Sequence, residues 1–551
     1  MNYKKYKRMP VVDLKDRQWP EHIITKAPIW CSVDLRDGNQ ALIQPMNVDE
    51  KMEMFQLLVK LGFKEIEIGF PAASQIEYDF LRELVKRDMI PDDVTVQVLT
   101  QCREHLIKRT FEAIRGIKNT IVHIYNSTST LQRDVVFHMN REEIKQIAVD
   151  GTRMVKECLK DHDGHITLQY SPESFSGTEV DFAMEVCTAV QKEWNYADGE
   201  KIIFNLPNTV EQTTPNVYAD QIEWMNRHFQ DRDRVILSVH PHNDRGCGVA
   251  ATELALLAGA DRVEGTLFGN GERTGNVDIL TVAYNMFSQG VDPELHIENI
   301  REIIDVYERC CKMEIDMRHP YAGQLVFTAF SGSHQDAINK GVHARKERND
   351  PYWEIPYLPI DPADIGRKYE PVVRINSQSG KGGVAFVMES LYGFKLPKAM
   401  QKEFADVIQA VSEKQGGEIS PQEIFDIFKK EYIALTDPFE FLKIRVDDVD
   451  DEKVGVWLDF RYKGEEIYVS ATGNGPLDAA KAAIRTRVDI DISVLDYSEH
   501  AMGEGSHARA AAYIQMRNNK TGKVIFGAGD SHNITKATMR AFFSALNRVS
   551  K

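Results

Sequence analysis

Short runs of β-forming residues alternate with amphipathic helical segments through the first half of the chain. Eight of these runs are predicted to be strands, at residues 29–36, 65–71, 95–100, 120–127, 165–173, 201–209, 235–244 and 262–269. Apolar strands that alternate with helices favour a parallel sheet covered on its outer face. Eight such units match a closed (β/α)8 TIM barrel, which usually takes about 250 residues. An open, doubly wound α/β sheet is the alternative.

The positions of the polar residues favour closure. The unusual polar side chains stand at the C-terminal ends of the predicted strands or in the loop after the last one, at Arg36, Asp37, His123, Glu173, Thr209, His240, His242 and Asn276. A TIM barrel gathers its active site at that face, on the loops that follow the strands. An open sheet would spread the same residues along an edge. We therefore expect one site at the barrel mouth.

Two further compositions follow the predicted barrel. Residues 326–435 have mostly helical patterns, interrupted by a linker-like stretch rich in Pro and Asp. From residue 436 a pattern of three strands and a helix is written twice, and each copy turns into its helix through a Gly-x-Gly, at 473–475 and 527–529. We predict a catalytic barrel at 1–325, helical linker subdomains at 326–435 and a C-terminal α+β (βββα)2 domain at 436–551.

Composition excludes several classes of function. The formal net charge of −16 argues against a nucleic-acid partner, and no apolar run approaches the roughly 20 residues of a membrane span. The basic start has no apolar stretch after it and does not resemble a secretory signal. The seven cysteines form no CxxC pair, which indicates reduced thiols in a cytoplasmic protein. Small molecules are the expected partners.

A His-x-His pair, His240 and His242, ends the seventh predicted strand. Residues two apart on a strand point to one face, so both imidazoles can share a metal ion. Asp37 and Asn276 follow the neighbouring first and eighth strands. This mixed set of N and O ligands suits Mg²⁺, Mn²⁺ or Zn²⁺ and leaves positions open for a substrate. A pair of structural polar residues at a strand end is the alternative.

Arg36 stands at the end of the first strand, where a guanidinium can hold a carboxylate or a developing enolate. A surface ion pair is the alternative. His123, Ser171, Glu173 and Thr209 offer hydrogen bonds and acid–base capacity at the same mouth, although each alone is more often structural.

The sequence FGNGERTGN, residues 268–276, is a glycine-rich loop after the last strand. The backbone amides around Gly269, Gly271 and Gly275 are predicted to form an anion-binding concavity that supports Asn276 and a bulky anionic cosubstrate. A tight turn is the alternative. His334 lies outside the barrel at the start of a predicted helix, where its own context indicates a solvated helix face.

These motifs resemble, in their order along the chain, those of the 2-isopropylmalate synthase family. The likeness covers nearly the whole chain and rests on LRDGNQ, HIYNSTS, YSPESFSGTE, NLPNTVE, HPHNDRG, FGNGERTGN, SGSHQDAI, DPADIGRKYE and NSQSGKGG. It implies an acyltransferase that condenses acetyl-CoA with 2-ketoisovalerate and hydrolyses the thioester, the first committed step of leucine biosynthesis. The wider group includes citramalate synthase, homocitrate synthase and hydroxymethylglutaryl-CoA lyase.

The resemblance also implies residue roles. The metal ligands would be Asp37, His240, His242 and Asn276, with Mg²⁺ the first choice, Mn²⁺ or Zn²⁺ as alternatives, and K⁺ as a monovalent activator. The keto acid would contact Arg36, His123, Ser171 and Thr209. Catalytic roles would fall to Arg36, Glu173, His334 and Tyr369, and the cosubstrate acetyl-CoA would meet Gly269, Asn270, Gly271 and Glu272.

The resemblance further implies a homodimer in which the helical subdomain of one subunit brings His334 and Tyr369 to the barrel of the other. The (βββα)2 repeat resembles a leucine-binding regulatory domain, which implies feedback inhibition. Residues 502–517 are more charged than the small, apolar run expected there, so the resemblance weighs less for leucine inhibition than for catalysis. The rival functions are a sister synthase using pyruvate or 2-ketoglutarate, a C–C lyase, and a non-catalytic leucine-binding regulator.

Overall fold

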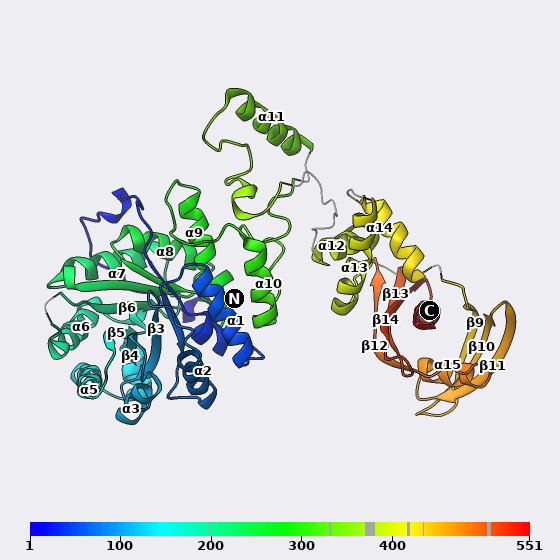
Figure 1. Cartoon of the computed structure of the whole chain (residues 1–551), viewed down its shortest axis with the longest axis horizontal. Coiled ribbons are helices and arrows are strands. Elements are labelled where there is room, and N and C mark those ends of the chain that lie inside the picture. The colour runs from blue at the N-terminus through cyan, green and yellow to red at the C-terminus, as the bar shows by residue number, and fades with distance from the viewer. Residues whose placement is uncertain are drawn as a thin grey trace. The chain divides into compact units, whose positions relative to one another are not determined.

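The structure is a computed structural model that describes residues 1–197, 199–329, 332–369, 381–415, 419–433, 435–503 and 508–550. The chain forms two compact units: Met1–Phe327 with Asp336–Tyr369, and Thr328–Gln335 with Glu370–Lys551 (Figure 1). The division into three domains at residues 325 and 435 stays a prediction. Among the helices of the described residues, none is both long and apolar enough to cross a membrane.

The first unit contains a closed barrel of eight strands in sequence order, which confirms the predicted fold and rules out the open sheet. All neighbouring strands are parallel, and β1 pairs with both β2 and β8. The strands are β1 (Ile29–Ser32), β2 (Glu65–Gly69), β3 (Thr95–Gln101), β4 (Asn119–Ser127), β5 (His165–Glu173), β6 (Ile202–Asn208), β7 (Val235–Pro241) and β8 (Arg262–Gly265).

Helices lie around the outside of these strands (Figure 1) and bury apolar residues. They are α1 (Val48–Lys60), α2 (Gln75–Lys86), α3 (Glu104–Ala113), α5 (Arg141–Leu159), α6 (Val180–Trp194), α7 (Pro215–His228), α8 (Gly248–Leu257), α9 (Ile279–Phe287) and α10 (Ile300–Cys311). The single turn α4 (Thr130–Gln132), which follows β4, has no buried residue. Helix boundaries follow local capping: α1 begins at a capping box in which Asn47 and Glu50 exchange hydrogen bonds.

The first and last barrel strands are shorter than predicted. β1 stops at Ser32 because the chain turns into a π-helical turn at Asp34–Gly38. The buried Asp34 carboxylate accepts hydrogen bonds from the Ser32 hydroxyl (2.7 Å) and from the Leu267 amide (3.0 Å), which ties this turn to the chain leaving β8. The turn carries Arg36 and Asp37, so neither is bound to the alternation of a strand.

The second unit contains the repeated βββα pattern, as predicted. Its sheets are antiparallel, in the orders β11-β10-β9 and β12-β13-β14. The helices that precede them are α11 (Gly332–Arg348), which the two units share, then α12 (Lys381–Tyr392), α13 (Lys398–Gln415) and α14 (Pro421–Phe428). The repeat consists of β9 (Phe439–Asp448), β10 (Val454–Tyr462), β11 (Glu465–Gly473), α15 (Pro476–Arg485), β12 (Ile492–Met502), β13 (Arg509–Asn518), β14 (Val524–Ser531) and α16 (Ile534–Ser550).

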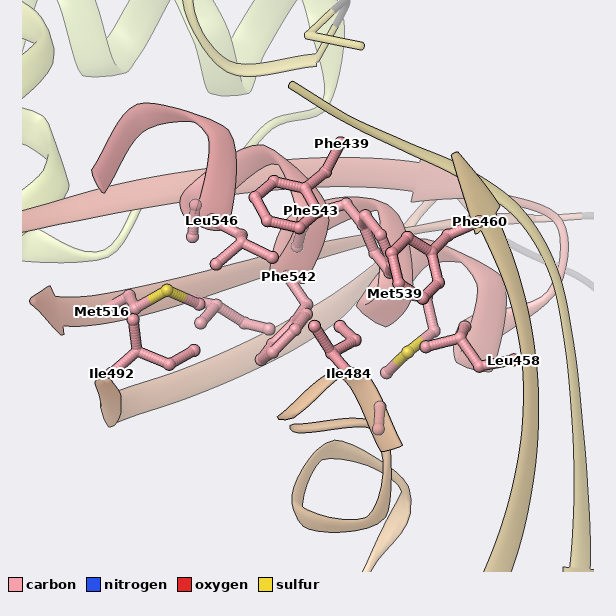
Figure 2. Packing of buried hydrophobic residues seen from close by; sticks show 14 of the residues in the cluster. Phe439, Leu458, Phe460, Ile484, Ile492, Met516, Met539, Phe542, Phe543 and Leu546 are labelled. Atoms are coloured by element: carbon pink, nitrogen blue, oxygen red, sulfur yellow. The ribbon is translucent and has the colours of Figure 1, made fainter. Parts of the chain in front are cut away.

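One apolar core joins the two copies of the repeat. Figure 2 shows Leu458 and Phe460 of β10, Met516 of β13 and Phe542 of α16 gathered in it. The second Gly-x-Gly allows close contact between β14 and α16, because a Cβ at Gly527 would lie 2.2 Å from the Ala545 backbone nitrogen.

Gly527→Ser should therefore destabilise the second unit by roughly 1–3 kcal/mol, the usual cost of overpacking a core. Gly475→Ser is the matched control: nothing lies within 4 Å of a Cβ there, φ is −175°, and serine is a preferred residue at this N-cap of α15. Calorimetry of the full chain measures both. Equal transition temperatures for the two variants would contradict the close-approach explanation.

Candidate active site

The barrel mouth brings together Asp37, His240 and His242, which we call the triad. Asp37 comes from the turn after β1, and the two histidines come from the end of β7. Their ligand atoms all lie within 4.8 Å of one another, and all three residues are buried. The Nε2 atom of His240 lies 3.3 Å from Asp37 Oδ2, and that of His242 lies 3.8 Å from the same oxygen.

Asn276 joins the triad from the loop after β8. Its amide oxygen lies 2.8 Å from His240 Nε2, and a backbone bridge pairs Asn276 with His242. The Asn276 Nδ2 donates to the Asn270 carbonyl (2.9 Å), which turns the amide oxygen toward the triad. All four residues proposed from sequence as metal ligands thus converge at one place.

The charges at the triad fit a bound divalent cation. Burial alone raises the pKa of Asp37, but the Arg36 charge and a hydrogen bond with His240 hold it well below its usual value. Burial alone lowers the pKa of His240, but hydrogen bonds with Asp37 and Glu264 raise it to about 10. A cation that replaces the proton on His240 would meet an ionised carboxylate, an amide oxygen and ring nitrogens, the donor set of a divalent metal site.

His242 differs from its neighbour in protonation. Burial and the nearby His240 lower the pKa of His242 to about 4, so this imidazole is neutral near pH 7 and has a lone pair to offer. Its Nδ1 atom is buried and has no hydrogen-bond partner among the described residues. No protein hydrogen bond therefore fixes the tautomer of His242 through Nδ1, and its Nε2, 3.8 Å from Asp37 Oδ2, can present the lone pair to a metal ion.

The glycine-rich loop packs directly against Asn276. A Cβ at Gly271 would lie 2.3 Å from Asn276 Nδ2, and one at Gly275 would lie 1.8 Å from the Gly269 carbonyl oxygen. Both residues have φ values in the range that favours glycine, +158° and +95°. The buried Asn270 donates to the Gly38 carbonyl (3.1 Å), and the exposed Glu272 accepts from Gln40 (3.1 Å). Binding of acetyl-CoA by Gly269, Asn270, Gly271 and Glu272 stays a prediction.

A second group of polar residues lies beside the triad, around Glu67 of β2. Arg36 donates to Glu67 Oε2 (2.5 Å) and to Asp37 Oδ1 (2.7 Å). The Nδ1 of His123 lies 3.2 Å from Glu67 Oε1, and its Nε2 lies 2.7 Å from the Ser171 hydroxyl. Arg36, His123 and Ser171, proposed from sequence as keto-acid contacts, thus form one hydrogen-bonded network with Glu67.

Glu173 and Thr209 lie at the ends of neighbouring strands. Ser127 donates a hydrogen bond to the Glu173 carboxylate, and the Thr209 hydroxyl accepts from the Ser174 amide (3.0 Å). Arg273 of the glycine-rich loop donates to the Thr209 carbonyl (2.5 Å) and so links the loop after β8 to the loop after β6. Both residues are partly buried.

His334 and Tyr369 belong to different compact units. His334 is exposed near the start of α11, in the second unit. Tyr369 ends the first unit, and its buried hydroxyl has no hydrogen-bond partner among the described residues. No hydrogen bond of the described residues joins Tyr369 to the triad. Most of the motif NSQSGKGG, at residues 376–380, lies outside the described residues. The catalytic roles of His334 and Tyr369 stay predictions.

Sequence reasoning missed the buried acidic residues of the barrel interior, Glu67 and Glu264. Both are fully buried and contact predicted site residues. The available signal was a carboxylate inside a short predicted strand, next to apolar residues: Glu67 in EIEIG and Glu264 in RVEG. Such a carboxylate in a closed barrel needs a partner.

Comparisons with known proteins match every part of the chain. The profile of the HMGL-like family matches residues 27–306, that of the alpha-isopropylmalate synthase post-catalytic domain-like family matches 324–389, and that of the LeuA allosteric (dimerisation) domain matches 418–550. A 2-isopropylmalate synthase from Clostridium acetobutylicum is 53% identical over 556 residues, covering 100% of this chain and 99% of its own. The chain belongs to the 2-isopropylmalate synthase family.

Other members of the 2-isopropylmalate synthase family are equally similar. The protein from Acetoanaerobium sticklandii is 52% identical over 100% of this chain and 97% of its own, and that from Rhodospirillum rubrum is 52% identical over 99% of each. Membership confirms the predicted enzyme class, an acyltransferase of the condensing type.

Solved structures of hydroxymethylglutaryl-CoA lyases are also similar. Those from Brucella melitensis and Pseudomonas aeruginosa are 15% and 20% identical, with TM-scores of 0.42 and 0.43. Each covers 52% of this chain, with 100% and 93% of its own length aligned. Membership of the 2-isopropylmalate synthase family rests on the full-length relatives.

Proposed function

We propose that this chain condenses acetyl-CoA with 2-ketoisovalerate and hydrolyses the thioester, giving 2-isopropylmalate and CoA in the first committed step of leucine biosynthesis. Relatives with this name align over the full chain. The observation that carries the proposal is the convergence of Asp37, His240 and His242 with Asn276 at the barrel mouth. A condensing enzyme of this class needs a polarised keto group, and this group of ligands supports such chemistry.

Asp37, His240, His242 and Asn276 would hold the divalent ion, with Mg²⁺ the first choice, Mn²⁺ or Zn²⁺ as alternatives, and K⁺ as an additional activator. When bound, the ion supplies a Lewis acid for the keto acid. Arg36 would bind negative charge on the substrate, since Glu67 and Asp37 fix its guanidinium and three of its five N–H groups remain for a ligand. His123 and Ser171 would contact the keto acid beside it, with Thr209 across the mouth.

The proton transfers would use the remaining proposed residues. A base, for which Glu173 and His334 are the candidates, removes a proton from the acetyl-CoA methyl group. The resulting carbon nucleophile attacks the keto carbon, and the keto oxygen takes up a proton, for which Tyr369 is a candidate donor. Water then cleaves the thioester to a carboxylate and free CoA, which makes the condensation irreversible in practice.

The family match also supports proposals about partners. The match at residues 418–550 is to an allosteric dimerisation domain, so we propose a homodimer that leucine inhibits. Acetyl-CoA would contact the loop of Gly269, Asn270, Gly271 and Glu272. These interactions rest on the family rather than on contacts within the structure, and the proposed place in the cytoplasm rests on the cysteines, which form no CxxC pair.

A CoA-release assay with a thiol reagent tests the proposed function. With acetyl-CoA and Mg²⁺, 2-ketoisovalerate should give a kcat/KM above those of pyruvate and 2-ketoglutarate by roughly 10-fold or more, because a methyl-scale misfit costs about 1–3 kcal/mol. Leucine should lower the rate. A preference for pyruvate or 2-ketoglutarate would favour a sister synthase, and no CoA release with any keto acid would favour a leucine-binding regulator.

Removal of divalent metal should abolish this CoA release. Dialysis against EDTA withdraws the ion that the triad and Asn276 would hold, and added Mg²⁺ or Mn²⁺ should restore the rate. The control is the transition temperature of the dialysed protein, which has to stay above the assay temperature so that loss of metal is separated from unfolding. Full activity in a chelated, metal-free sample would refute the metal role.

A further inference from the structure

A buried carboxylate, Glu264 of β8, lies next to the triad and receives hydrogen bonds from several strands. Its side chain is fully buried. Its Oε2 atom lies 2.8 Å from His240 Nδ1 and accepts from Asn205 Nδ2 at 3.1 Å. Its Oε1 atom accepts from three further donors, on Gln97 (3.0 Å), Gln169 (2.7 Å) and Arg262 (2.7 Å). We call Glu264 and these five partners the hub.

The hub is unusual for a barrel interior, which is normally filled with layers of apolar side chains. Buried polar groups are costly unless all of them are paired. Glu264 is fully paired, and Arg262 balances its charge while also donating to Glu65 and to Gln97. A layer built at this cost, directly beside the triad, indicates a role at the site rather than in packing alone.

We propose that Glu264 is a positioning residue that fixes the tautomer and the ring orientation of His240. An ionised carboxylate only accepts hydrogen bonds, so the ring nitrogen that faces it, Nδ1, must carry the hydrogen. A neutral imidazole has a single N–H, and its Nε2 therefore presents a lone pair. This inference rests on the proposed function, because it assigns His240 Nε2 as the atom that would meet the metal.

The surroundings of His240 Nε2 are those of a nitrogen whose proton a metal ion would replace. Its two nearest polar atoms, Asp37 Oδ2 at 3.3 Å and Asn276 Oδ1 at 2.8 Å, are both acceptors. The Asn276 oxygen cannot exchange places with its NH2 group without losing the hydrogen bond to the Asn270 carbonyl. With one hydrogen held on Nδ1 by Glu264, the Nε2 atom, Asp37 Oδ2 and Asn276 Oδ1 face one point, and a metal ion bound there would replace a proton on Nε2.

The hub also reaches the residues proposed to contact the keto acid. Asn205 Nδ2 donates to Ser171 Oγ (3.1 Å) as well as to Glu264, and Gln97 Nε2 donates to Glu67 (3.0 Å) as well as to Glu264. Glu264 thus connects the proposed metal ligand His240 and the proposed keto-acid contacts in one hydrogen-bonded layer. A carboxylate partner behind a metal-binding histidine commonly contributes 10- to 100-fold in metal affinity, by about this kind of orientation.

Glu264→Gln inverts the proposed interaction with little change of shape. In this variant the side-chain amide oxygen should occupy the position of Glu264 Oε1, because three donors, including the charged Arg262, face that position. The new NH2 group then takes the position of Oε2 and faces His240 Nδ1. The Asn205 Oδ1 atom has no partner among the described residues and can accept the second N–H after an amide flip. Nδ1 then becomes the acceptor, the hydrogen moves to Nε2, and that nitrogen loses its lone pair for the metal.

Gln169→Met is the matched control. It removes another donor to the same carboxylate, at the same depth and with similar volume, but leaves the contact between Glu264 and His240 intact. Binding of Mn²⁺ to each full-length protein, without substrates, is measured from the electron-spin-resonance signal of free Mn²⁺. We expect the Kd of Glu264→Gln to rise about 10- to 100-fold and that of Gln169→Met to change less than about 3-fold.

The outcomes separate this inference from the proposed function. If the wild-type protein binds no Mn²⁺, both are overturned. If the wild type binds Mn²⁺ and Glu264→Gln binds it equally well, or if both variants lose affinity alike, only the positioning role is overturned. Should Glu264→Gln fail to fold, a crystal structure of the wild type with Mn²⁺ decides: coordination through His240 Nε2 supports the inference, and coordination through Nδ1 or by Glu264 itself contradicts it.

Discussion

Replacing Asp37 by alanine is expected to abolish Mn²⁺ binding and to lower kcat for CoA release by more than about 10³-fold, beyond the 10- to 100-fold cost of losing an outer-sphere partner. Asp37 supplies the negative charge of the proposed ligand set, whose other members are two imidazoles and an amide. Without it, the positive Arg36 would remain beside the site and repel a cation.

Asp79→Ala is the control for this variant, because it removes an exposed carboxylate of α2 that accepts a hydrogen bond from Gln75 of the same helix. It should keep the wild-type Kd for Mn²⁺ and the wild-type kcat. Transition temperatures of both variants establish that they are folded. A folded Asp37→Ala protein that binds Mn²⁺ and turns over normally would end the metal assignment.

Replacing Arg36 by lysine should lower kcat about 10²- to 10³-fold while Mn²⁺ binding persists, the usual cost of removing one charge-stabilising donor. The Arg36 guanidinium spans Glu67 and Asp37 and still has donors for a substrate. A lysine ammonium is a compact charge that cannot reproduce this planar geometry. The split between an impaired kcat and a retained metal Kd distinguishes this variant from Asp37→Ala.

Arg153→Lys, in a surface ion pair with Asp150, is the matched control and should behave as wild type. Steady-state CoA release at saturating Mg²⁺ measures both arginine variants. A wild-type kcat for Arg36→Lys would mean that any positive charge suffices at this position, and that the paired geometry is not used.

Periodicity was enough to predict the barrel and the βββα repeat, but not where β1 and β8 end. The β-forming pattern continues through Val33 and Leu35, whereas the chain turns away because the Asp34 carboxylate binds Leu267, more than two hundred residues later. A contact of that kind leaves no periodic trace in the sequence. Local pattern therefore predicts the elements better than their ends.

The site residues also divide into those that the sequence pattern predicts and those that it does not. Residues at strand ends were predictable, because parallel strands in a barrel deliver their C-terminal ends to one face. Glu67 and Glu264 were not, because alternation alone does not say whether a strand residue points into a closed barrel or outward. The proposed catalytic role of His334 stays a prediction, because His334 belongs to the second unit and no strand pattern links it to the barrel.

The proposed ligands come from either side of the join between β1 and β8, where the first strand of the circle meets the last. Asp37 follows β1, whereas His240 ends β7 and Asn276 follows β8. A cation bound there would link residues that follow the first and the last strand. Its binding free energy would therefore also oppose opening of the barrel between β1 and β8. Removing the metal would then lower the stability of the barrel as well as abolish its activity.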